Sequence, residues 1–399
     1  MKILHISRFG IIAHETTCGY GGRAFEKPVC ALQKMGCQAR VIAPVPHVPF
    51  LARRLSGKWR RYAKIPLHEA VDDIIVFHPR YISFPNSLFL YFSGILMYYG
   101  MKRLIRKIHR EFAFDLIHAH NVFPDGYAGL LLSRDYHKPL VVTVQATDLY
   151  ITAKRSYACF KLLRKILASA GRVISPSPGL RSNLYAGFGI NSEMICYGID
   201  LEEAYSTASS KNSGDYGGRT ILLSVSQLEP RKGIDFNLHA LGRLAPWHDK
   251  LYYLIIGDGS ERRKLEKLTR ALGLSNIVKF LGNLPHKKTM EFMSICDIFS
   301  LPSWLETFGL VYLEAMAHGK PVIGCKGAGI DSIISEGKAG LLAEPKDVDS
   351  LAGAINFLLN NPIEAQAMGE RARRLVSRDY SYGRNADQTL GLYKRLLNS

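Results

Sequence analysis

The chain has 399 residues, 47% of them hydrophobic, which is enough to bury two cores, so two domains are expected. Residues 1–200 hold 27 Lys and Arg against 12 Asp and Glu, a net charge of +15, whereas residues 201–399 hold 25 against 22, a net charge of +3. No apolar run reaches the roughly 20 residues of a membrane crossing, and seven scattered cysteines form no paired framework. This composition excludes a membrane-spanning or disulfide-scaffolded chain, and it favours a reducing cytoplasm and an anionic partner.

The first residues form a strand–loop–helix unit. A strand over Ile3–Ser7 runs into a loop that ends at Gly21 and Gly22, and a helix follows and closes at Gly36. Two glycines at this place let the backbone approach a phosphate or a sugar. The alternative is an ordinary turn.

Two basic segments of the first half contain aromatic or apolar residues. Residues 53–64 interleave six cations with Trp59 and Tyr62, and residues 102–110 place cations opposite Leu104, Ile105 and Ile108, after the aromatic stretch 84–101. Cations beside aromatic side chains are typical of an interfacial contact with an anionic membrane. A solvated basic loop and a core helix with a basic face are the alternatives.

Polar residues follow several expected strands of the first half. The strands are 115–120, 139–147 and 172–177, and the first of them carries the pair His118 and His120. We expect these two side chains on opposite faces with no third ligand nearby, so no metal site is predicted. Residues 201–219 lose apolar periodicity and gather Ser, Gly and Asn, which predicts a linker.

The second half repeats the alternation of strands and helices. Strands are expected over 220–226, 251–257, 278–281, 298–301 and 321–324. Alternating β and α units predict an α/β fold with one doubly wound parallel sheet in each domain.

The stretch 301–319 contains the strongest candidate site. A strand precedes Glu306, and helical spacing from Gly309 onward places Glu306 in a loop and Glu314 about two turns along a helix. A loop at the carboxyl end of a parallel strand suits phosphate and sugar binding. The alternative is a helix whose Glu314 faces solvent.

The run from Pro302 to Val322 resembles the retaining, nucleotide-sugar-dependent glycosyltransferases of family 4, whose Glu-x7-Glu element matches Glu306 and Glu314. The resemblance extends through Gly257-Asp258-Gly259, Arg231-Lys232-Gly233 and Gly21-Gly22. It implies a GT-B fold, in which two Rossmann-like domains face a cleft. The corresponding limits are 1–200 for the acceptor-side domain, 201–219 for the linker, 220–378 for the nucleotide-sugar domain and 379–399 for a helix that packs back across the junction.

The same resemblance implies roles for individual residues. Lys232 would bind the diphosphate, Glu306 the donor sugar, Glu314 the ribose, and His120 would lie near the transferring sugar. Gln227 stands where relatives often have Arg, and Arg231 is a candidate replacement. The remaining expected substrate contacts are Gly21, Gly22, Gly257, Phe308, Gly309 and Leu310. Neither a metal nor a cofactor is expected.

The predicted function is transfer of a sugar to a lipid-linked or glycan acceptor in bacterial cell-surface polysaccharide biosynthesis, at the cytoplasmic face of the membrane. Stretches 41–50 and 79–85 resemble the teichuronic acid biosynthesis subgroup. The alternatives are a phospholipid glycosyltransferase similar to a phosphatidylinositol mannosyltransferase, and a GT-B nucleotide-sugar epimerase. A nucleic-acid-binding protein is disfavoured, because no recognised nucleic-acid module is present.

Overall fold

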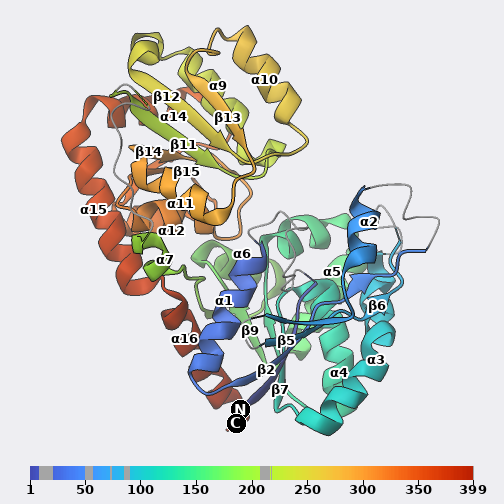
Figure 1. Cartoon of the computed structure of the whole chain (residues 1–399). Helices are drawn as coiled ribbons and strands as arrows, with labels where there is room; N and C mark the ends of the chain where they lie inside the picture. Colours follow the sequence, from blue (N-terminus) through green and yellow to red (C-terminus); the bar gives the residue numbers. More distant parts are fainter. Residues whose placement is uncertain are drawn as a thin grey trace. The chain divides into compact units, whose positions relative to one another are not determined.

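The computed structural model describes residues 1–8, 21–49, 57–71, 74–84, 90–206, 216 and 218–398. The chain divides into two compact units, which are described separately. Unit 1 comprises Met1–Cys196 and Tyr382–Ser399, and unit 2 comprises Tyr197–Ser381 (Figure 1).

A mainly parallel sheet forms the centre of unit 1, with strand order β10-β9-β8-β7-β1-β2-β5-β4. Only the β4/β5 pair among these is antiparallel. The strands are β1 (Lys2–Ile6), β2 (Gln38–Ile42), β4 (His68–Val71), β5 (Ile74–Phe77), β7 (Leu116–Ala119), β8 (Leu140–Thr143), β9 (Arg172–Ser175) and β10 (Glu193–Met194). A separate two-stranded pair joins β3 (Val45–Pro46) and β6 (Arg80–Tyr81).

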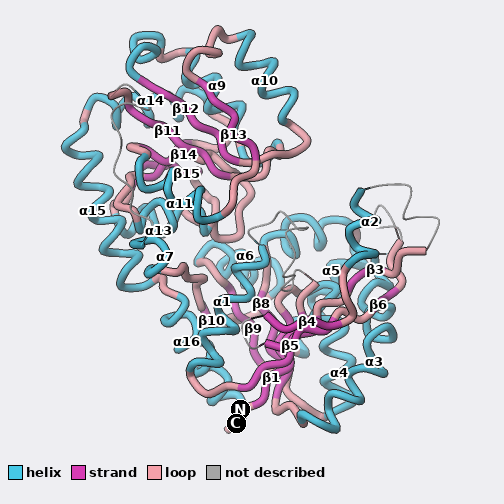
Figure 2. The backbone as a smooth tube through the Cα atoms, in the orientation of Figure 1, coloured by secondary structure: helices cyan, strands magenta, loops and turns pink. Residues whose placement is uncertain are grey.

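Helices cover both faces of this sheet (Figure 2). Because successive strand residues point to opposite faces, Ile3 lies in one core and Leu4 in another. The core that contains Ile3 is closed by α1 (Gly21–Lys34) and α16 (Tyr382–Leu397). The core that contains Leu4 is closed by α3 (Ser93–Phe112), α4 (Tyr127–Tyr136), α5 (Tyr157–Ser169) and α6 (Pro178–Phe188). The other helical segments of unit 1 are α2 (Gly57–Lys64), η3 (Leu90–Phe92), η4 (Val122–Gly126), η5 (Asp148–Thr152) and η6 (Ala153–Arg155).

Unit 2 is built on a parallel sheet of order β13-β12-β11-β14-β15-β16. Its four central strands are buried along most of their length, as expected for strands covered on both faces, whereas the two edge strands are partly exposed. They are β11 (Thr220–Val225), β12 (Leu251–Ile256), β13 (Val278–Gly282), β14 (Ile298–Ser300), β15 (Val322–Cys325) and β16 (Gly340–Ala343). The helical segments are α7 (Leu201–Ser206), η7 (Pro230–Lys232), α9 (Ile234–Gly242), η8 (Ala245–Lys250), α10 (Arg262–Ala271), α11 (His286–Ile295), α12 (Leu310–Ala317), α13 (Asp331–Gly337), α14 (Val348–Asn360) and α15 (Pro362–Asp379).

The two units therefore confirm the expected α/β class with two doubly wound sheets. Residues 201–206 of the predicted linker form α7, whose Ala204 is buried, and most of the rest of that linker lies outside the described residues. The last helix begins at Tyr382, six residues before its expected start, and returns the chain to unit 1. The domain limits themselves stay a prediction.

None of the described helices combines the length and the apolarity that a membrane crossing needs. The six described cysteines are all free thiols.

Candidate functional site

The candidate site of unit 2 lies where the strand order of its sheet reverses. The chain passes from β11 outward to β12 and β13, and then returns to add β14 on the other side of β11. Loops at the carboxyl ends of two such strands leave the sheet in opposite directions and open a crevice, which is where open α/β sheets bind ligands. The segments that follow β11 and β14 contain Lys232 and Glu306.

Lys232 and Glu306 meet at this point although 74 residues separate them. The Lys232 Nζ atom lies 2.5 Å from Oε2 of Glu306. The two side chains are only 12% and 16% exposed, so the pair is screened less than a surface ion pair. This arrangement holds one cation and one carboxylate at the mouth of the crevice, where each can exchange its partner for a ligand.

The Glu306 loop ends in a turn that needs glycine. Gly309 has φ of +89° and directly precedes the first turn of α12. A Cβ atom at this position would lie 2.6 Å from the ring of Tyr312. The turn presents the free backbone N–H groups of the helix start beside Glu306.

Glu314 lies on α12 and is almost fully buried, so the alternative of a solvent-facing carboxylate is wrong. Its Oε1 atom lies 3.1 Å from Nε2 of His286, and Nδ1 of His286 lies 2.9 Å from Oε1 of Glu203. Its Oε2 atom is buried and has no hydrogen-bond partner among the residues that the structure describes. A buried carboxylate oxygen without a partner is costly, and a ligand hydroxyl would satisfy it.

Sequence reasoning missed His286 and Glu203. His286 is the first residue of α11 and Glu203 lies on α7, so they belong to elements far from Glu314 in the chain. Neither follows a Gly-rich loop, and Glu203 falls in the segment interpreted as a linker. The only local signal is that His286 begins a helix after Pro285.

The other expected site residues of unit 2 are placed as follows. Arg231 donates from Nε to Glu229, at 2.7 Å, and from Nη1 to the carbonyl of Leu305, at 3.2 Å, so its guanidinium supports the Glu306 loop. Gln227 is exposed at the end of β11. Gly257 follows β12 with φ of +127°, and a Cβ atom there would lie 1.8 Å from the carbonyl oxygen of Ser226.

Phe308 contributes to the loop through its backbone. The ring is buried and contacts Tyr197 and Tyr380, with centroids 5.7 and 6.0 Å away. Leu310 is the first residue of α12 and is partly exposed. Both residues therefore flank Gly309 where a ligand could meet the backbone.

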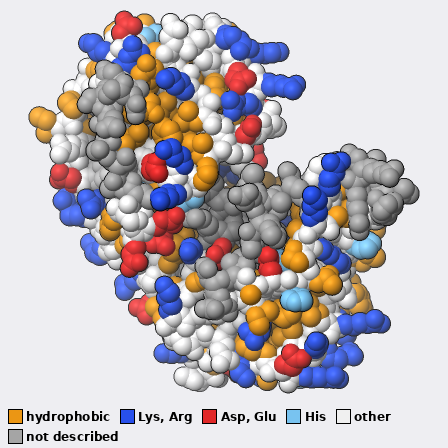
Figure 3. Space-filling model, in the orientation of Figure 1, with side chains coloured by type: hydrophobic (Ala, Val, Ile, Leu, Met, Phe, Trp, Pro, Cys, Tyr) orange, Lys and Arg blue, Asp and Glu red, His pale blue; other side chains and the backbone are white. Residues whose placement is uncertain are grey.

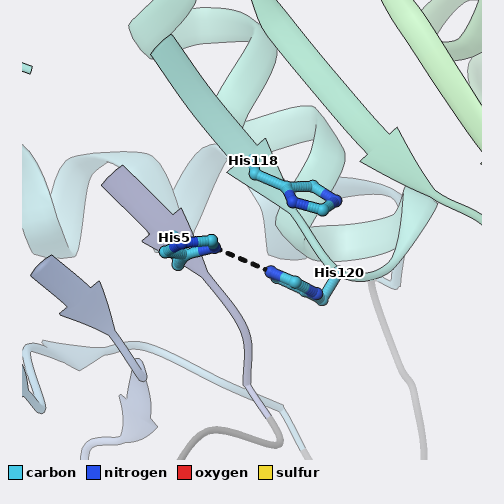
Figure 4. A group of neighbouring side chains, drawn as sticks. All are labelled: His5, His118 and His120. Carbon is cyan, nitrogen blue, oxygen red and sulfur yellow. Dashed lines mark hydrogen bonds between the residues drawn. The ribbon is translucent and has the colours of Figure 1, made fainter. Parts of the chain in front are cut away.

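In unit 1 the strand order reverses between β1 and β7, and a cluster of histidines lies there. His5 pairs with His118 in the strand register, and His120 follows β7 directly. The expectation that His118 and His120 face opposite sides is wrong, because residues two apart in a strand share a face. Their ring centroids lie 4.0 Å apart, and His5 is a third histidine beside them (Figure 4).

Hydrogen bonds and burial define the state of this cluster. His5 Nδ1 lies 3.0 Å from His120 Nε2, and His118 bonds Tyr393 and Thr143 at 2.6 and 2.8 Å. Burial lowers the pKa of His5 to about 3. Burial, reinforced by the neighbouring imidazoles, holds the pKa of His118 and of His120 well below the ordinary value. All three rings are therefore neutral at physiological pH.

A metal ion fits this cluster poorly, although ring nitrogens of the three histidines lie within 4.8 Å of one another. Histidine ligands direct lone pairs in the plane of the ring, and the stacked rings of His118 and His120 are only 30° from parallel. A metal would also displace the hydroxyl partners of His118 or the bond between His5 and His120. We therefore assign no metal here.

Two buried carboxyl groups lie in the short helical segments that follow β7 and β8. Asp148 accepts backbone N–H groups of Gln145, Val122 and Phe123 at 2.9, 3.1 and 3.3 Å. Burial raises the pKa of Asp148 to about 6, although these bonds oppose the shift. Burial also raises the pKa of Asp125, which accepts from Asn121.

Gly21 and Gly22, which were expected to end the loop before the helix, are the first two residues of α1. Residues 9–20 of the preceding loop lie outside the described residues.

Comparison with known families accounts for both units. Residues 29–203 match the family model described as Glycosyltransferase Family 4, and residues 206–375 match the model described as Glycosyl transferases group 1. The chain belongs to the family 4 glycosyltransferases of GT-B fold.

Two curated glycosyltransferases align with more than half of the chain. It is 26% identical to the putative teichuronic acid biosynthesis glycosyltransferase TuaC of Bacillus subtilis, over 90% of both chains. It is 29% identical to a GDP-mannose-dependent phosphatidylinositol monomannoside mannosyltransferase of Mycolicibacterium smegmatis, over 53% of this chain and 59% of that protein.

Two solved structures show the same fold. Sucrose-phosphate synthase from Thermosynechococcus elongatus superposes with a TM-score of 0.81 at 22% identity and covers 100% of this chain and 99% of its own. Anabaena HepE, solved with UDP and glucose, gives 0.73 at 21% identity, over 99% of this chain and 100% of its own.

Proposed function

We propose that this glycosyltransferase moves a sugar, with retention of anomeric configuration, from a nucleotide-diphosphate sugar to a lipid-linked or glycan acceptor during assembly of a bacterial cell-surface polysaccharide. The observation that carries the proposal is the meeting of Lys232 and Glu306 at the strand-order reversal of unit 2. A cation that stabilises a departing diphosphate and a carboxylate that grips sugar hydroxyls are the groups which this reaction requires.

The donor would occupy the carboxyl ends of β11 and β14. Lys232 faces the diphosphate, and the N–H groups at Phe308, Gly309 and Leu310 meet phosphate or sugar oxygens. Glu306 accepts from sugar hydroxyls, and the unpartnered Oε2 of Glu314 accepts from the ribose diol. Neither a metal nor a cofactor is part of the proposal.

The sequence offers no pair of opposed acid and base carboxylates of the kind used by glycoside hydrolases. In the proposed reaction the anomeric carbon–oxygen bond to the diphosphate breaks, and a bond to the acceptor oxygen forms on the same face. The acceptor proton passes to the departing phosphate oxygen. His120 lies near the transferring sugar.

The acceptor side is proposed to work at the inner face of the membrane, against anionic lipid. Exposed apolar side chains lie just before β4, just after β6, in η3 and in α3. They include Leu67, Ile82, Phe84, Tyr91, Phe92 and Tyr99. Arg80 of β6 donates from Nη1 to the Tyr62 carbonyl of α2, at 3.3 Å. On α3, Ile105 and Ile108 are buried as expected for a core helix, while Arg103, Arg106 and Lys107 are exposed. Figure 3 shows Lys and Arg side chains gathered over the part of unit 1 where α3 lies in Figure 1. Apolar side chains rimmed by cations match an anionic bilayer surface.

A phospholipid acceptor is the second candidate, supported by the similarity to the mycobacterial mannosyltransferase. A GT-B epimerase is the third. The two transferases would differ in product: a sugar on a polyprenyl diphosphate lipid, or a sugar on a phosphoinositide.

The test is transfer of radiolabelled sugar from nucleotide sugars into an organic extract of bacterial membrane lipid. We expect the wild type to transfer label to the lipid fraction and Glu306→Ala to transfer no label. With an α-linked donor, the wild-type product should also be α-linked. Conversion of the nucleotide sugar to an epimer without acceptor would overturn the proposal. Label confined to phosphoinositide would favour the second candidate.

A further inference from the structure

His5 and His120 make a hydrogen bond whose direction the surrounding structure decides. The bond joins Nδ1 of His5 to Nε2 of His120 at 3.0 Å, and the rings come from β1 and from the end of β7 (Figure 4). Because both rings are neutral, one of the two bonded nitrogens carries a hydrogen and donates it, and the lone pair of the other accepts the hydrogen bond. Two tautomeric arrangements are available.

The other ring nitrogen of His5, Nε2, shows which of the two tautomeric arrangements is present. Nε2 of His5 is buried and has no hydrogen-bond partner among the described residues. If the His5 proton were on Nε2, an N–H group would be buried without an acceptor, which folded proteins rarely tolerate. If the proton is on Nδ1, it is used in the bond to His120 and only a lone pair is left over. The second arrangement avoids the unpaired donor.

This arrangement fixes the state of His120. Its Nε2 lone pair is occupied by His5, so its own proton must be on Nδ1. Two aromatic rings hold the His120 ring in place. Phe25 contacts it edge to face with ring centroids 4.4 Å apart, and the His118 ring centroid lies 4.0 Å away. Within the cluster His5 and His118 are buried, whereas His120 is partly exposed, and no described residue bonds its Nδ1.

We propose that His5 is a positioning residue that locks His120 as a neutral Nδ1–H tautomer, so that His120 serves sugar transfer as a hydrogen-bond donor to a sugar or acceptor oxygen and never as a proton acceptor. This inference rests on the proposed function, because it assigns the chemistry of the histidine placed beside the transferring sugar. It also agrees with a reaction in which the departing phosphate takes the acceptor proton, since no histidine base is then needed.

No carboxylate of the described residues makes a hydrogen bond to this pair. The groups that face it are the imidazole of His118, the ring of Phe25 and, beyond His118, the hydroxyls of Thr143 and Tyr393. Asp148 accepts from backbone N–H groups, and Oδ2 of Asp125 accepts from Asn121 and from the backbone N–H of Arg8. The buried Oδ1 of Asp125 has no partner among the described residues and makes no hydrogen bond to His5 or His120. An imidazolium at His120 would therefore have no counter-charge within hydrogen-bonding distance among the described residues.

The direct test is a long-range ¹H–¹⁵N NMR spectrum of the full chain with ¹⁵N-labelled histidine, assigned with single-histidine variants. We expect His120 and His5 to show a protonated Nδ1 and an unprotonated Nε2 from pH 8 to pH 6. A proton on Nε2 of His120, or a charged His120 at pH 6, would overturn the assignment.

Two variants of equal shape test the positioning role. His5→Asn keeps an N–H donor near the place of Nδ1, whereas His5→Leu removes it. We expect His120 to keep its tautomer in the Asn variant and to become a tautomeric mixture in the Leu variant. Activity is measured as release of nucleoside diphosphate from the nucleotide sugar that gives labelled lipid. We expect the kcat to fall about tenfold in the Leu variant alone, with little change in KM.

A purely structural role would lower the melting temperature and kcat of both variants alike, and that result would contradict the proposal. If the NMR tautomers are as expected but His120→Ala retains the wild-type kcat, the donor role of His120 fails. If no nucleotide sugar is turned over by the wild type while the tautomers are as expected, the proposed function fails and the tautomer assignment remains.

Discussion

At the scale of single residues, the ion pair between Lys232 and Glu306 is the part of the site whose removal has the clearest consequence. The Lys232 ammonium is the one cation that the described residues place beside the Glu306 carboxylate. We expect Lys232→Ala to weaken donor binding by roughly ten- to a hundredfold, because a charge-assisted contact to phosphate contributes about 1.5–3 kcal/mol. Isothermal titration with the donor measures this change.

The matched control is Lys267→Ala, which removes an exposed lysine of α10 in the same unit. Its donor affinity should equal that of the wild type. Equal losses in the two variants would mean that Lys232 acts only through the net charge of the unit.

The buried histidines give stability a defined pH dependence. The pKa of His5 is lowered to about 3, so between pH 6.5 and 3 the His5 ring is protonated in the unfolded chain and neutral in the folded chain. Stability contributed by this neutral ring is present above the unfolded pKa and falls as the pH falls, by at most about 1.4 kcal/mol per pH unit. The lowered pKa values of His118 and His120 act in the same direction.

Asp148 changes the stability in the opposite direction as the pH falls. Its pKa is raised to about 6, so the folded chain binds the proton at a higher pH than the unfolded chain does, and this stabilises the folded chain. The raised pKa of Asp125 adds to this. Burial also lowers the pKa of His109 and that of His318, the latter to about 4. Five such histidines against two carboxyl groups predict a melting temperature that declines from pH 7 to pH 5. The decline should be shallower in His5→Leu, as differential scanning calorimetry would reveal. Parallel curves for the two proteins would refute the linkage.

At the scale of elements, the short helix α7 supports the candidate ribose carboxylate through His286. The two ring nitrogens of His286 lie 2.9 Å from Oε1 of Glu203 and 3.1 Å from Oε1 of Glu314, so one imidazole joins both carboxyl groups. This fixes Oε1 of Glu314 and leaves Oε2 for a ligand. We expect His286→Leu to raise the KM for the donor about tenfold with a smaller effect on kcat, since a positioned acceptor for the ribose is lost.

We expect Glu203→Gln to raise the donor KM less than His286→Leu does, because the amide oxygen of Gln can still accept a hydrogen bond from His286. A donor KM unchanged in His286→Leu would show that Glu314 is positioned by α12 alone.

The local pattern of the Glu306 region was enough to predict its elements. Apolar spacing placed a strand before the loop and a helix from Gly309 onward, and β14 and α12 confirm both. Neither His286 nor Glu203 could be found in this way, because their roles depend on contacts 28 and 83 residues apart in the chain. The histidine cluster was missed for the same reason: His5 reaches His120 only through the parallel register of β1 and β7.

At the scale of the whole molecule, the excess positive charge of residues 1–200 is proposed to hold the enzyme on anionic membranes. Three exposed cations of α3 contribute to it, and each basic residue near such a surface stabilises binding by about 1 kcal/mol. We expect the triple variant Arg103→Gln, Arg106→Gln, Lys107→Gln to bind phosphatidylglycerol vesicles about a hundredfold more weakly in cosedimentation, and more weakly still at high salt.

The control is Arg263→Gln, Lys267→Gln, Arg270→Gln on α10, which removes the same charge from exposed positions of unit 2. If both triple variants lose the same affinity, binding depends on net charge and not on the surface around α2, β6 and α3.

We propose that unit 2 binds a nucleotide-diphosphate sugar between the ends of β11 and β14. A thermal-shift screen of the full chain against UDP-, GDP-, ADP- and dTDP-sugars, with and without anionic vesicles, tests it most directly. We expect one nucleotide class to raise the melting temperature of the wild type, and we expect a smaller rise in Lys232→Ala and in Glu314→Ala. No shift with any nucleotide in either condition, or a shift that both variants retain in full, would contradict it.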